Sequence, residues 1–260
     1  MSSKKSSKDK KSVLQKKVTV SISEAGNKRY VNWLCSPGNK CVPVEGPIFT
    51  ENVNWRIFRI MAEFVEGFEF LSKLKKEVTI FGSARAMPSS KYYKLAEKLG
   101  SLLGKKGYSV ITGGGPGIME AANKGTLDAG GVSIGLDIEL PMGQRRNDFV
   151  NKAMGFHYFF TRKVMLSASA QAYIFFPGGG GTMDEMTEML TLIQTMKIPR
   201  TVPMILIGKK FWQPLLDWMT NIMCEEYGFI AKEELAIMRL VDTAEEAMKI
   251  IEKTSEREFG

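Results

Sequence analysis

The stretch PGGGGTMDE, residues 177–185, combines a run of glycines with groups that could take part in chemistry. Glycines let a backbone approach a ligand closely, and a glycine loop that leads into a helix exposes N–H groups at the positive end of the helix dipole. Such a loop suits a phosphate or a carboxylate. The same glycines could also do no more than form a tight strand-to-helix turn.

Charged residues near this loop could supply reaction chemistry. If a helix begins at Thr182, Glu185 lies in its first turn on the ligand's side, while Met186, Met189, Leu190 and Ile193 form a buried stripe. An acid in a first turn also favours the helix dipole or caps the helix, so Glu185 alone does not establish a reaction.

Arg162 and Lys163, in FFTRKVML, provide the opposite charge and follow aromatic residues that could stack on a base. An arginine can clamp a phosphate through its fork of donors or donate a hydrogen bond to a departing base. The alternative is that this pair is the solvated start of a helix.

Strand and helix patterns alternate from residue 77 onward, which predicts a Rossmann-like α/β fold, doubly wound, with a mostly parallel sheet and helices on both faces. Ligands of such sheets bind at the carboxyl ends of the strands. Three of the expected strands end in glycine clusters, at residues 82–83, 113–117 and 178–181. Because these clusters meet at one edge, an anionic ligand is expected there.

Two nucleotide-binding motifs are missing from these loops. The chain has no G-x-x-x-x-G-K-[ST], and neither GGGPGIME nor PGGGGTMDE fits G-x-G-x-x-G, since Met183 and Asp184 stand where a further glycine would be needed. The sequence therefore does not support a P-loop nucleotide hydrolase, and it weakens the hypothesis of an NAD-binding site. A mononucleotide or a sugar phosphate suits the loops better.

Three regions are expected: a basic disordered tail over residues 1–17, an N-terminal extension over residues 18–76 and a catalytic domain over residues 77–260. In the extension, residues 52–76 predict an amphipathic helix that docks on the main domain or on a partner. Its apolar stripe would be part of the core and consists of Ile57, Ile60, Met61, Phe64, Phe68 and Leu71.

The formal net charge of +8 by itself suggests nucleic-acid binding, but the distribution of the charged residues along the chain does not. Seven lysines and one aspartate stand in residues 1–17, so the remainder carries only +2. The tail is interpreted as a solubilising extension rather than a nucleic-acid or acidic-partner site. No apolar window is long enough to span a bilayer and the N-terminus does not resemble a secretory signal, so a cytoplasmic protein without a membrane partner is expected.

Metal and hydrolase-triad chemistry have little support in this composition. Cys35, Cys41 and Cys224 form no C-x-x-C pair, which predicts reduced thiols. His157, the single histidine, follows a glycine and a phenylalanine and is expected to be a packed ring beside aromatics. We therefore expect no metal site.

Together these motifs resemble a known family. PGGGGTMDE fits P-G-G-x-G-T-x-x-E, and with GGGPGIME and the upstream Arg-Lys pair the chain resembles the Lonely Guy (LOG) family over residues 77–210. These are cytokinin riboside 5'-monophosphate phosphoribohydrolases, often labelled lysine decarboxylases. A lysine decarboxylase would need a lysine that binds pyridoxal phosphate in a recognisable setting, and the sequence shows none.

The resemblance implies hydrolysis of the N-glycosidic bond of an adenosine 5'-monophosphate, often N6-substituted, to free base and ribose 5-phosphate, without a cofactor. It implies a homodimer or higher homo-oligomer and a catalytic pair, Arg162 and Glu185. The implied substrate-binding residues are Gly82, Ser83, Gly113, Gly114, Gly115, Gly117, Lys163, Gly178, Gly179, Gly180, Gly181, Thr182, Asp184 and Thr191.

Two positions depart from plant-type members. Thr161 stands where an acidic or amide residue is common, and Gly180 stands where a tyrosine or phenylalanine is common. The long N-terminal extension resembles bacterial-type members, and plain AMP is an alternative to a cytokinin nucleotide. A nucleotide or cofactor carrier on the same fold, like the molybdenum-cofactor carriers, is a second alternative, but a carrier would not require both Arg162 and Glu185.

Overall fold

The computed structural model describes residues 32–35, 41–44, 53–139 and 146–257. The chain divides into two compact units, Met1–Asn52 and Val53–Gly260. In the first unit, β1 (Asn32–Cys35) pairs with β2 (Cys41–Val44) in an antiparallel hairpin. The basic tail and the side chains of Cys35 and Cys41 lie outside the described residues, whereas Cys224 is a free thiol.

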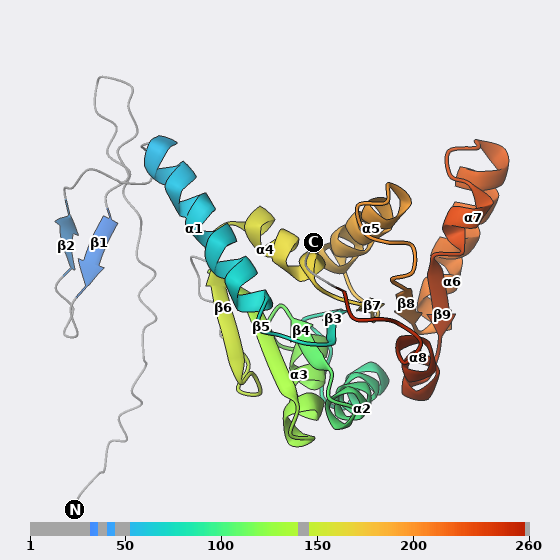
Figure 1. Ribbon diagram of the computed structural model, residues 1–260, viewed down its shortest axis with the longest axis horizontal. Coiled ribbons are helices and arrows are strands. Elements are labelled where there is room, and N and C mark those ends of the chain that lie inside the picture. The colour runs from blue at the N-terminus through green and yellow to red at the C-terminus, as the bar shows by residue number, and fades with distance from the viewer. Residues whose placement is uncertain (1–31, 36–40, 45–52, 140–145, 258–260) are drawn as a thin grey trace, which may run out of the picture. The chain divides into compact units, whose positions relative to one another are not determined.

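Seven strands of the second unit form one parallel sheet in the order β6-β5-β4-β3-β7-β8-β9 (Figure 1). Their bounds are β3 (Glu77–Phe81), β4 (Ser109–Thr112), β5 (Val132–Ile138), β6 (Lys152–Phe156), β7 (Ala172–Phe175), β8 (Met204–Ile207) and β9 (Met238–Val241). The chain builds outward from β3 to β6 and then returns to place β7 on the other side of β3. The carboxyl ends of β3 and β7 therefore flank the point where the strand order reverses, which is where such sheets bind ligands.

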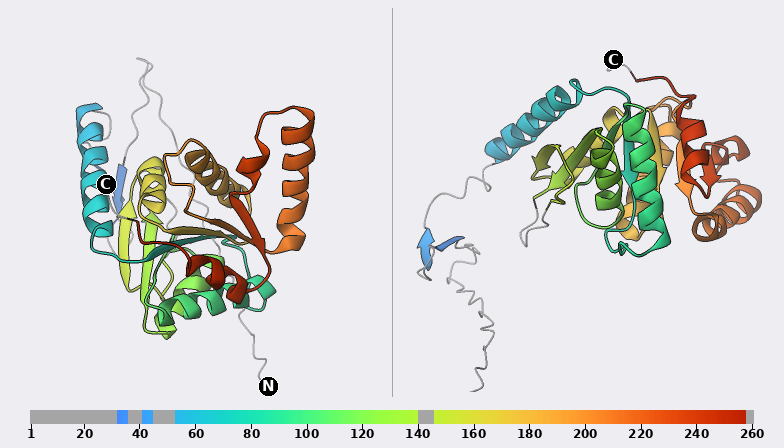
Figure 2. Two further views of the ribbon diagram at one scale, coloured as in Figure 1. Left: turned by 45° about the vertical axis from the view of Figure 1, so that its right-hand side comes forward. Right: turned by 90° about the horizontal axis from the view of Figure 1, so that it is seen from below.

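Helices cover both faces of this sheet and enclose a separate apolar core on each side (Figure 2). On one face lie α2 (Lys91–Lys105), α3 (Ile118–Asp128) and α8 (Ala244–Ile251). The other face carries α1 (Val53–Leu71), α4 (Phe159–Ala168), α5 (Gly180–Gln194), α6 (Lys209–Trp218), the π-helix η1 (Met219–Glu226) and α7 (Lys232–Leu235). The central strands β3, β4, β7 and β8 are buried along their whole length, as a parallel sheet covered on both faces requires.

The predicted doubly wound α/β fold is confirmed, and so is the buried stripe of α5. Two details differ. Helix α5 begins at Gly180, two residues before the expected start at Thr182. The edge strand β6 was not predicted, because the sequence KAMGF is short and contains a glycine, and only its last residue is buried, so its pattern does not alternate.

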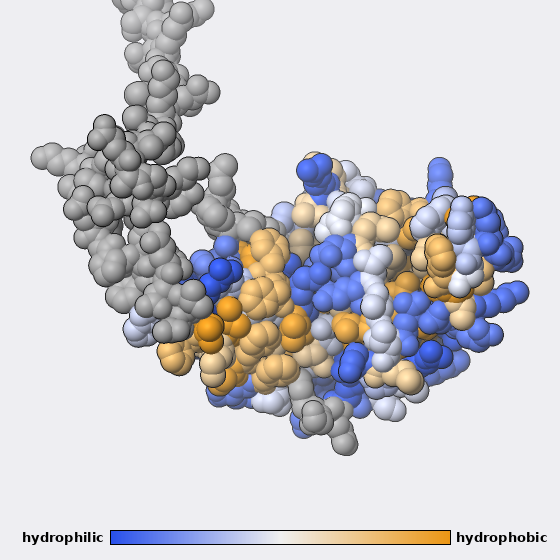
Figure 3. Space-filling view, turned by 90° about the horizontal axis from the view of Figure 1, so that it is seen from above, coloured by the Kyte–Doolittle hydropathy of each residue, from blue (hydrophilic) through white to orange (hydrophobic). Residues whose placement is uncertain are grey.

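Helix α1 packs on the same unit as the sheet, but the prediction that its apolar stripe is core was wrong for much of that stripe. Leu71 is buried, whereas Ile57, Met61 and Phe68 are between 42% and 55% exposed. The helix lies against α4 at Gly67, where an added Cβ would be 2.5 Å from the sulfur of Met165. Because of this close approach, the side of α1 that carries Glu63 and Gly67 faces inward. Apolar side chains gather on the surface of the protein, as Figure 3 shows.

Candidate active site

Three strand-to-helix loops converge at one edge of the sheet because β4, β3 and β7 are neighbours. The loops are tied to one another by backbone hydrogen bonds. Ser83 N–H donates to the carbonyl of Pro177 at 3.1 Å, and Ile118 N–H donates to the carbonyl of Ser83 at 3.0 Å. The expectation that the glycine clusters meet at one edge is therefore fulfilled.

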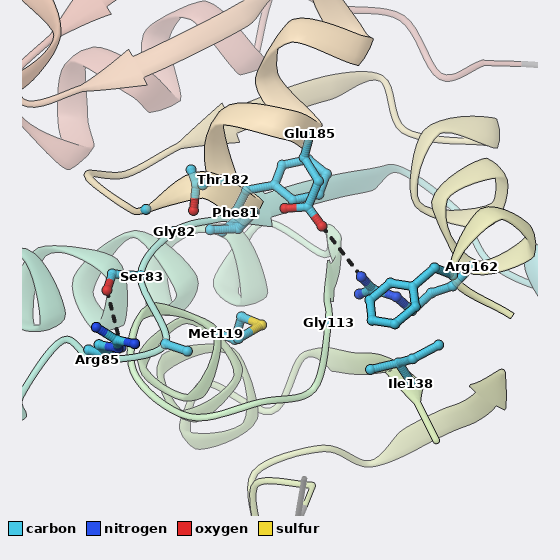
Figure 4. Close-up of a pocket in the computed structure, with 16 residues that line it drawn as sticks. Phe81, Gly82, Ser83, Arg85, Gly113, Met119, Ile138, Arg162, Thr182 and Glu185 are labelled. Carbon is cyan, nitrogen blue, oxygen red and sulfur yellow. Dashed lines mark hydrogen bonds and ion pairs between the residues drawn. The ribbon is translucent and has the colours of Figure 1, made fainter. Parts of the chain in front are cut away.

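The loops enclose a cavity of about 430 Å³ (Figure 4). Its lining combines loop glycines, two arginines, one carboxylate and several apolar side chains. The lining residues are Ile80, Phe81, Gly82, Ser83, Ala84, Arg85, Gly113, Met119, Ile138, Phe159, Arg162, Gly179, Gly180, Gly181, Thr182 and Glu185.

The glycines at the start of α5 leave open space in front of the helix. A Cβ added at Gly179, Gly180 or Gly181 would meet no atom within 4 Å. Helix α5 has no side-chain cap, and its first backbone N–H with an intrahelical acceptor is that of Met183, which donates to Gly179. The preceding N–H groups are thus available to an anion at the positive end of the helix.

Other glycines of these loops serve close packing. At Gly178 an added Cβ would be 2.1 Å from Thr182 Oγ1, and at Gly117, which has φ +74°, it would be 2.3 Å from the carbonyl oxygen of Ser83. The carbonyls of Gly114 and Gly115 each accept a hydrogen bond from the side-chain amide of Asn147 at 3.0 Å. These four glycines shape the loops without lining the cavity.

Arg162 of α4 and Glu185 of α5 both line the cavity and point toward each other (Figure 4). Arg162 Nη2 lies 3.6 Å from Glu185 Oε1, and both side chains are more than four-fifths buried. Burial raises the pKa of Glu185 to about 7, while the charge of Arg162 opposes this rise. A carboxylate with that pKa can accept a proton near neutral pH, as a general base must.

Few contacts hold the guanidinium of Arg162. Burial lowers the pKa of Arg162, and the charges of Glu185 and Asp137 oppose that effect. The guanidinium lies 5.7 Å from the centroid of the Phe159 ring, and its Nε is buried without a hydrogen-bond partner among the described residues. Its donors therefore remain available to a ligand.

Three of the residues expected to bind substrate lie beside the cavity and do not line it. Lys163 Nζ contacts Asp184 Oδ2 at 2.9 Å and Glu188 Oε2 at 3.0 Å, which links α4 to α5. The Thr191 hydroxyl donates to the carbonyl of Thr187 at 2.9 Å, further along α5. Lys163, Asp184 and Thr191 are thus neighbours of Arg162 and Glu185 in this structure and do not line the cavity.

Some residues that line the cavity were not predicted from the sequence. Arg85 directly follows the expected glycine turn at residues 82–84, and this position could have identified it as a lining residue. Met119 and Ile138 carry no chemical signature, and only the fold brings them to the cavity. The aromatic residue expected beside the arginine is Phe159.

Neighbouring features give no sign of metal chemistry in the described ranges. No cluster of three or more metal-ligating side chains occurs among the residues whose placement is known. The ring of His157 stacks edge-on against Tyr158 as expected, but its side chain is 39% exposed rather than packed, because it reaches toward Glu139 on the surface. No helix of the described segments is long and apolar enough to cross a membrane.

Residues 119–251, just over half of the chain, match the model of the family described as "Possible lysine decarboxylase". The chain belongs to this family, the LOG family. Among curated LOG proteins, the cytokinin riboside 5'-monophosphate phosphoribohydrolase LOG of Oryza sativa subsp. japonica is 28% identical over 200 residues, which cover 73% of this chain and 78% of the rice protein.

Solved structures also match about two thirds of the chain. The structural-genomics target TM1055 is 26% identical, has a TM-score of 0.53 and covers 68% of this chain and 99% of its own. The molybdenum cofactor binding protein from Rippkaea orientalis is 24% identical, has a TM-score of 0.50 and covers 68% of this chain and 93% of its own. The second likeness concerns the fold alone.

Proposed function

We propose that this LOG-family chain hydrolyses the N-glycosidic bond of an adenosine 5'-monophosphate, releasing the free base and ribose 5-phosphate. The observation that carries the proposal is the buried Arg162–Glu185 pair, which lines a nucleotide-sized cavity together with the open N-terminus of α5. The name of the rice relative supports the same reaction.

The phosphate would bind where the N-terminus of α5 meets the cavity. The free N–H groups of Gly180 and Gly181 and the hydroxyl of Thr182 are suitable donors, and the helix dipole favours the negative charge. Arg85 also lines the cavity and would add a cation beside the turn at Ser83. In Figure 4, Ser83, Arg85 and Thr182 lie on one side of the cavity and Arg162 lies on the other.

Glu185 would act on the attacking water. As the bond between C1' and the base nitrogen breaks, the ribose acquires oxocarbenium character, which a nearby carboxylate stabilises. Glu185 takes a proton from the water whose oxygen joins C1', and the base leaves with the bonding electron pair. The base then receives the proton that Glu185 took up, relayed through solvent, which restores the carboxylate. Arg162 would stabilise negative charge, either on the departing base or on the phosphate.

The base would lie against Met119, Ile138 and Phe159, which form an apolar part of the lining. Such a surface accommodates a plain adenine as well as an adenine with an apolar N6 substituent, so both AMP and a cytokinin nucleotide are proposed substrates. The chemistry assigned to the chain uses water and no cofactor.

We extend the proposal to assembly as a homodimer or higher homo-oligomer. Helices α1 and α4 contact each other and carry exposed apolar side chains, among them Phe58, Val65 and Phe160. Figure 3 shows apolar side chains gathered on one part of the surface. Contiguous apolar patches of this kind mark protein interaction sites. Phe159 is 56% exposed and also lines the cavity, so a second copy on this face would stand next to the active site.

Incubation with AMP and with isopentenyl-AMP, followed by chromatography of free base and ribose 5-phosphate, tests the reaction. We expect base and ribose 5-phosphate in equal amounts from at least one substrate, and loss of both products in Arg162→Ala and Glu185→Ala. Binding of AMP without release of base from either substrate would refute hydrolysis and favour the carrier alternative.

A further inference from the structure

A buried carboxylate from α1 sits at the N-terminus of the helix that carries Arg162. Glu63 is 7% exposed and accepts three hydrogen bonds there. The N–H of His157 donates to its Oε1 at 2.9 Å, while the N–H of Tyr158 and the hydroxyl of Thr161 donate to its Oε2 at 3.4 Å and 2.6 Å.

These contacts replace a cap that α4 does not provide for itself. Tyr158 is the N-cap residue, and its side chain makes no capping hydrogen bond. In a capping box, the residue at the third helical position supplies the carboxylate or amide that accepts from the N-cap N–H. Here that position holds Thr161, and the carboxylate comes from another helix.

Helix α1 is held firmly enough to deliver this carboxylate. Gly67 approaches the sulfur of Met165 so closely that an added Cβ would be 2.5 Å away, and Leu71 is fully buried in the core beneath α4. Arg59 Nε lies 3.7 Å from Glu63 Oε1 and offsets part of its charge. The negative charge also favours the positive end of α4.

The position of Arg162 depends on this helix start. Its side chain makes no hydrogen bond among the described residues, and its ion pair with Glu185 spans 3.6 Å. The residue directly follows Thr161, and its N–H donates to the carbonyl of Tyr158 at 3.3 Å. The backbone that Glu63 caps therefore sets where the guanidinium stands.

We propose that Glu63 is a positioning residue, which holds the N-terminus of α4 from α1 and so places Arg162 opposite Glu185. The inference deepens the proposed function and rests on it for its kinetic test. It assigns a role in the active site to a residue that does not line the cavity.

The kinetic test compares Glu63→Ala, Glu63→Gln and Glu66→Ala with the wild-type protein, using AMP or isopentenyl-AMP well below the melting temperature of each variant. Misplacement of a catalytic group by about 1 Å can cost about 100-fold, so Glu63→Ala should lower kcat by about 10- to 100-fold with KM within about threefold. Glu66 is an exposed glutamate of the same helix, and its removal should leave kcat unchanged.

Glu63→Gln is the conservative variant. Its carbonyl oxygen can still accept from His157, and its amide can donate to the hydroxyl of Thr161, which lies 2.8 Å from the carbonyl of Tyr158 and can donate there instead. We expect kcat of Glu63→Gln within about threefold of wild type. The activation free energy would then change by at most about half of the amount that a tenfold change in rate requires.

The pH dependence of kcat separates misplacement from a loss of folded protein. Glu185 is faced by Arg162 and Lys163 from α4 and by Asp184 and Glu188 of its own helix. If Arg162 moves away in Glu63→Ala, its lowering effect on the pKa of Glu185 weakens, and the acid limb of the profile shifts to higher pH. A smaller folded fraction would reduce kcat without moving that limb.

The proposal is wrong if Glu63→Ala keeps the kcat and the acid limb of the wild type. It is also wrong if kcat and melting temperature fall while the limb stays in place, because Glu63 would then serve stability alone. If the wild-type protein cleaves neither nucleotide, the proposed function fails, and crystal structures of wild type and Glu63→Ala decide this inference. A shift of the Arg162 guanidinium by about 1 Å or more would support it, and a smaller shift would overturn it.

Discussion

The guanidinium of Arg162 and the carboxylate of Glu185 come within 3.6 Å of each other, although they stand on different helices at the ends of different loops. Glu185 is attached to α5, whose start is fixed by the glycine loop after β7. Arg162 is attached to α4, whose start is fixed by α1. Each partner can therefore be tested by changes that leave the other in place.

Activity should rise with pH through neutrality. Because burial raises the pKa of Glu185 to about 7, its proton-accepting form is scarce at pH 5 and dominant at pH 8. In Glu185→Gln this acid limb should disappear and kcat should fall by about 100-fold or more, as expected for loss of a general base. Rates measured from pH 5 to 9 check this, and a flat wild-type profile would exclude Glu185 as the base.

The same residue should lower the stability of the folded protein above neutral pH. An acid whose pKa is higher in the folded than in the unfolded state makes folding less favourable as pH rises between the two values. For Glu185 this interval runs from 4.5, the ordinary pKa of a glutamate, to about 7, so Glu185→Gln should gain stability at pH 8, at most on the order of 3 kcal/mol, and nothing below pH 4. Urea unfolding at both pH values measures the difference, with the exposed Glu66→Gln as control. Equal gains at both pH values would contradict the prediction.

Alanine at Gly181 and at Gly178 should have different effects. A Cβ at Gly181 enters open space beside the cavity, so Gly181→Ala should fold normally and raise KM for AMP by occupying the room of the phosphate. A Cβ at Gly178 would be 2.1 Å from Thr182 Oγ1, so Gly178→Ala should lower the melting temperature by disturbing the start of α5. Calorimetry and steady-state kinetics on the two variants decide, and an unchanged KM in Gly181→Ala would argue against phosphate binding at this loop.

Lys163 and Arg162 should differ although they are adjacent. Lys163 is ion-paired with Asp184 and Glu188 beside the cavity, so Lys163→Ala should keep kcat within about tenfold, whereas Arg162→Ala should lose about 100-fold or more. Initial rates at saturating substrate make the comparison. Equal losses in the two variants would restore to Lys163 the substrate role that the family resemblance implies.

Charge on the apolar face of α1 should disrupt assembly. Phe58→Glu and Val65→Glu place carboxylates among exposed apolar side chains and should convert an oligomer to monomer in light scattering coupled to size-exclusion chromatography. Phe229→Glu changes a residue that is 78% exposed near α7 and should leave the oligomer intact. A wild-type monomer would refute the assembly proposal.

The arrangement of glycine loops was predictable because it depends on local patterns. Glycines after Phe81, Thr112 and Phe175 mark strand ends, and parallel sheets bring strand ends to one edge. The pair of Arg162 and Glu185 was predictable only with the family resemblance. The residues by themselves left open whether each was a functional group or an ordinary charge at the start of a helix.

Other parts of the site depend on long-range packing that no local pattern reports. Helical spacing on α1 predicted that Phe68 lies in the core. In the structure, Gly67 packs closely against Met165, so the side of α1 that faces inward carries Gly67 and the buried Glu63. Nothing in the sequence joins Glu63 to Thr161, which are 98 positions apart. The threonine before the Arg-Lys pair, Thr161, donates a hydrogen bond to that distant carboxylate at 2.6 Å.

The contact between α1 and α4 also bears on where this enzyme could be divided or transplanted. A fragment that starts at residue 77 would keep every glycine loop, Arg162, Glu185 and the entire stretch matched by the family, yet the N–H groups of His157 and Tyr158 at the start of α4 would lack their acceptor. The smallest portable unit therefore starts at Val53, and an exchange of domains with a relative would have to move α1 and α4 as a pair.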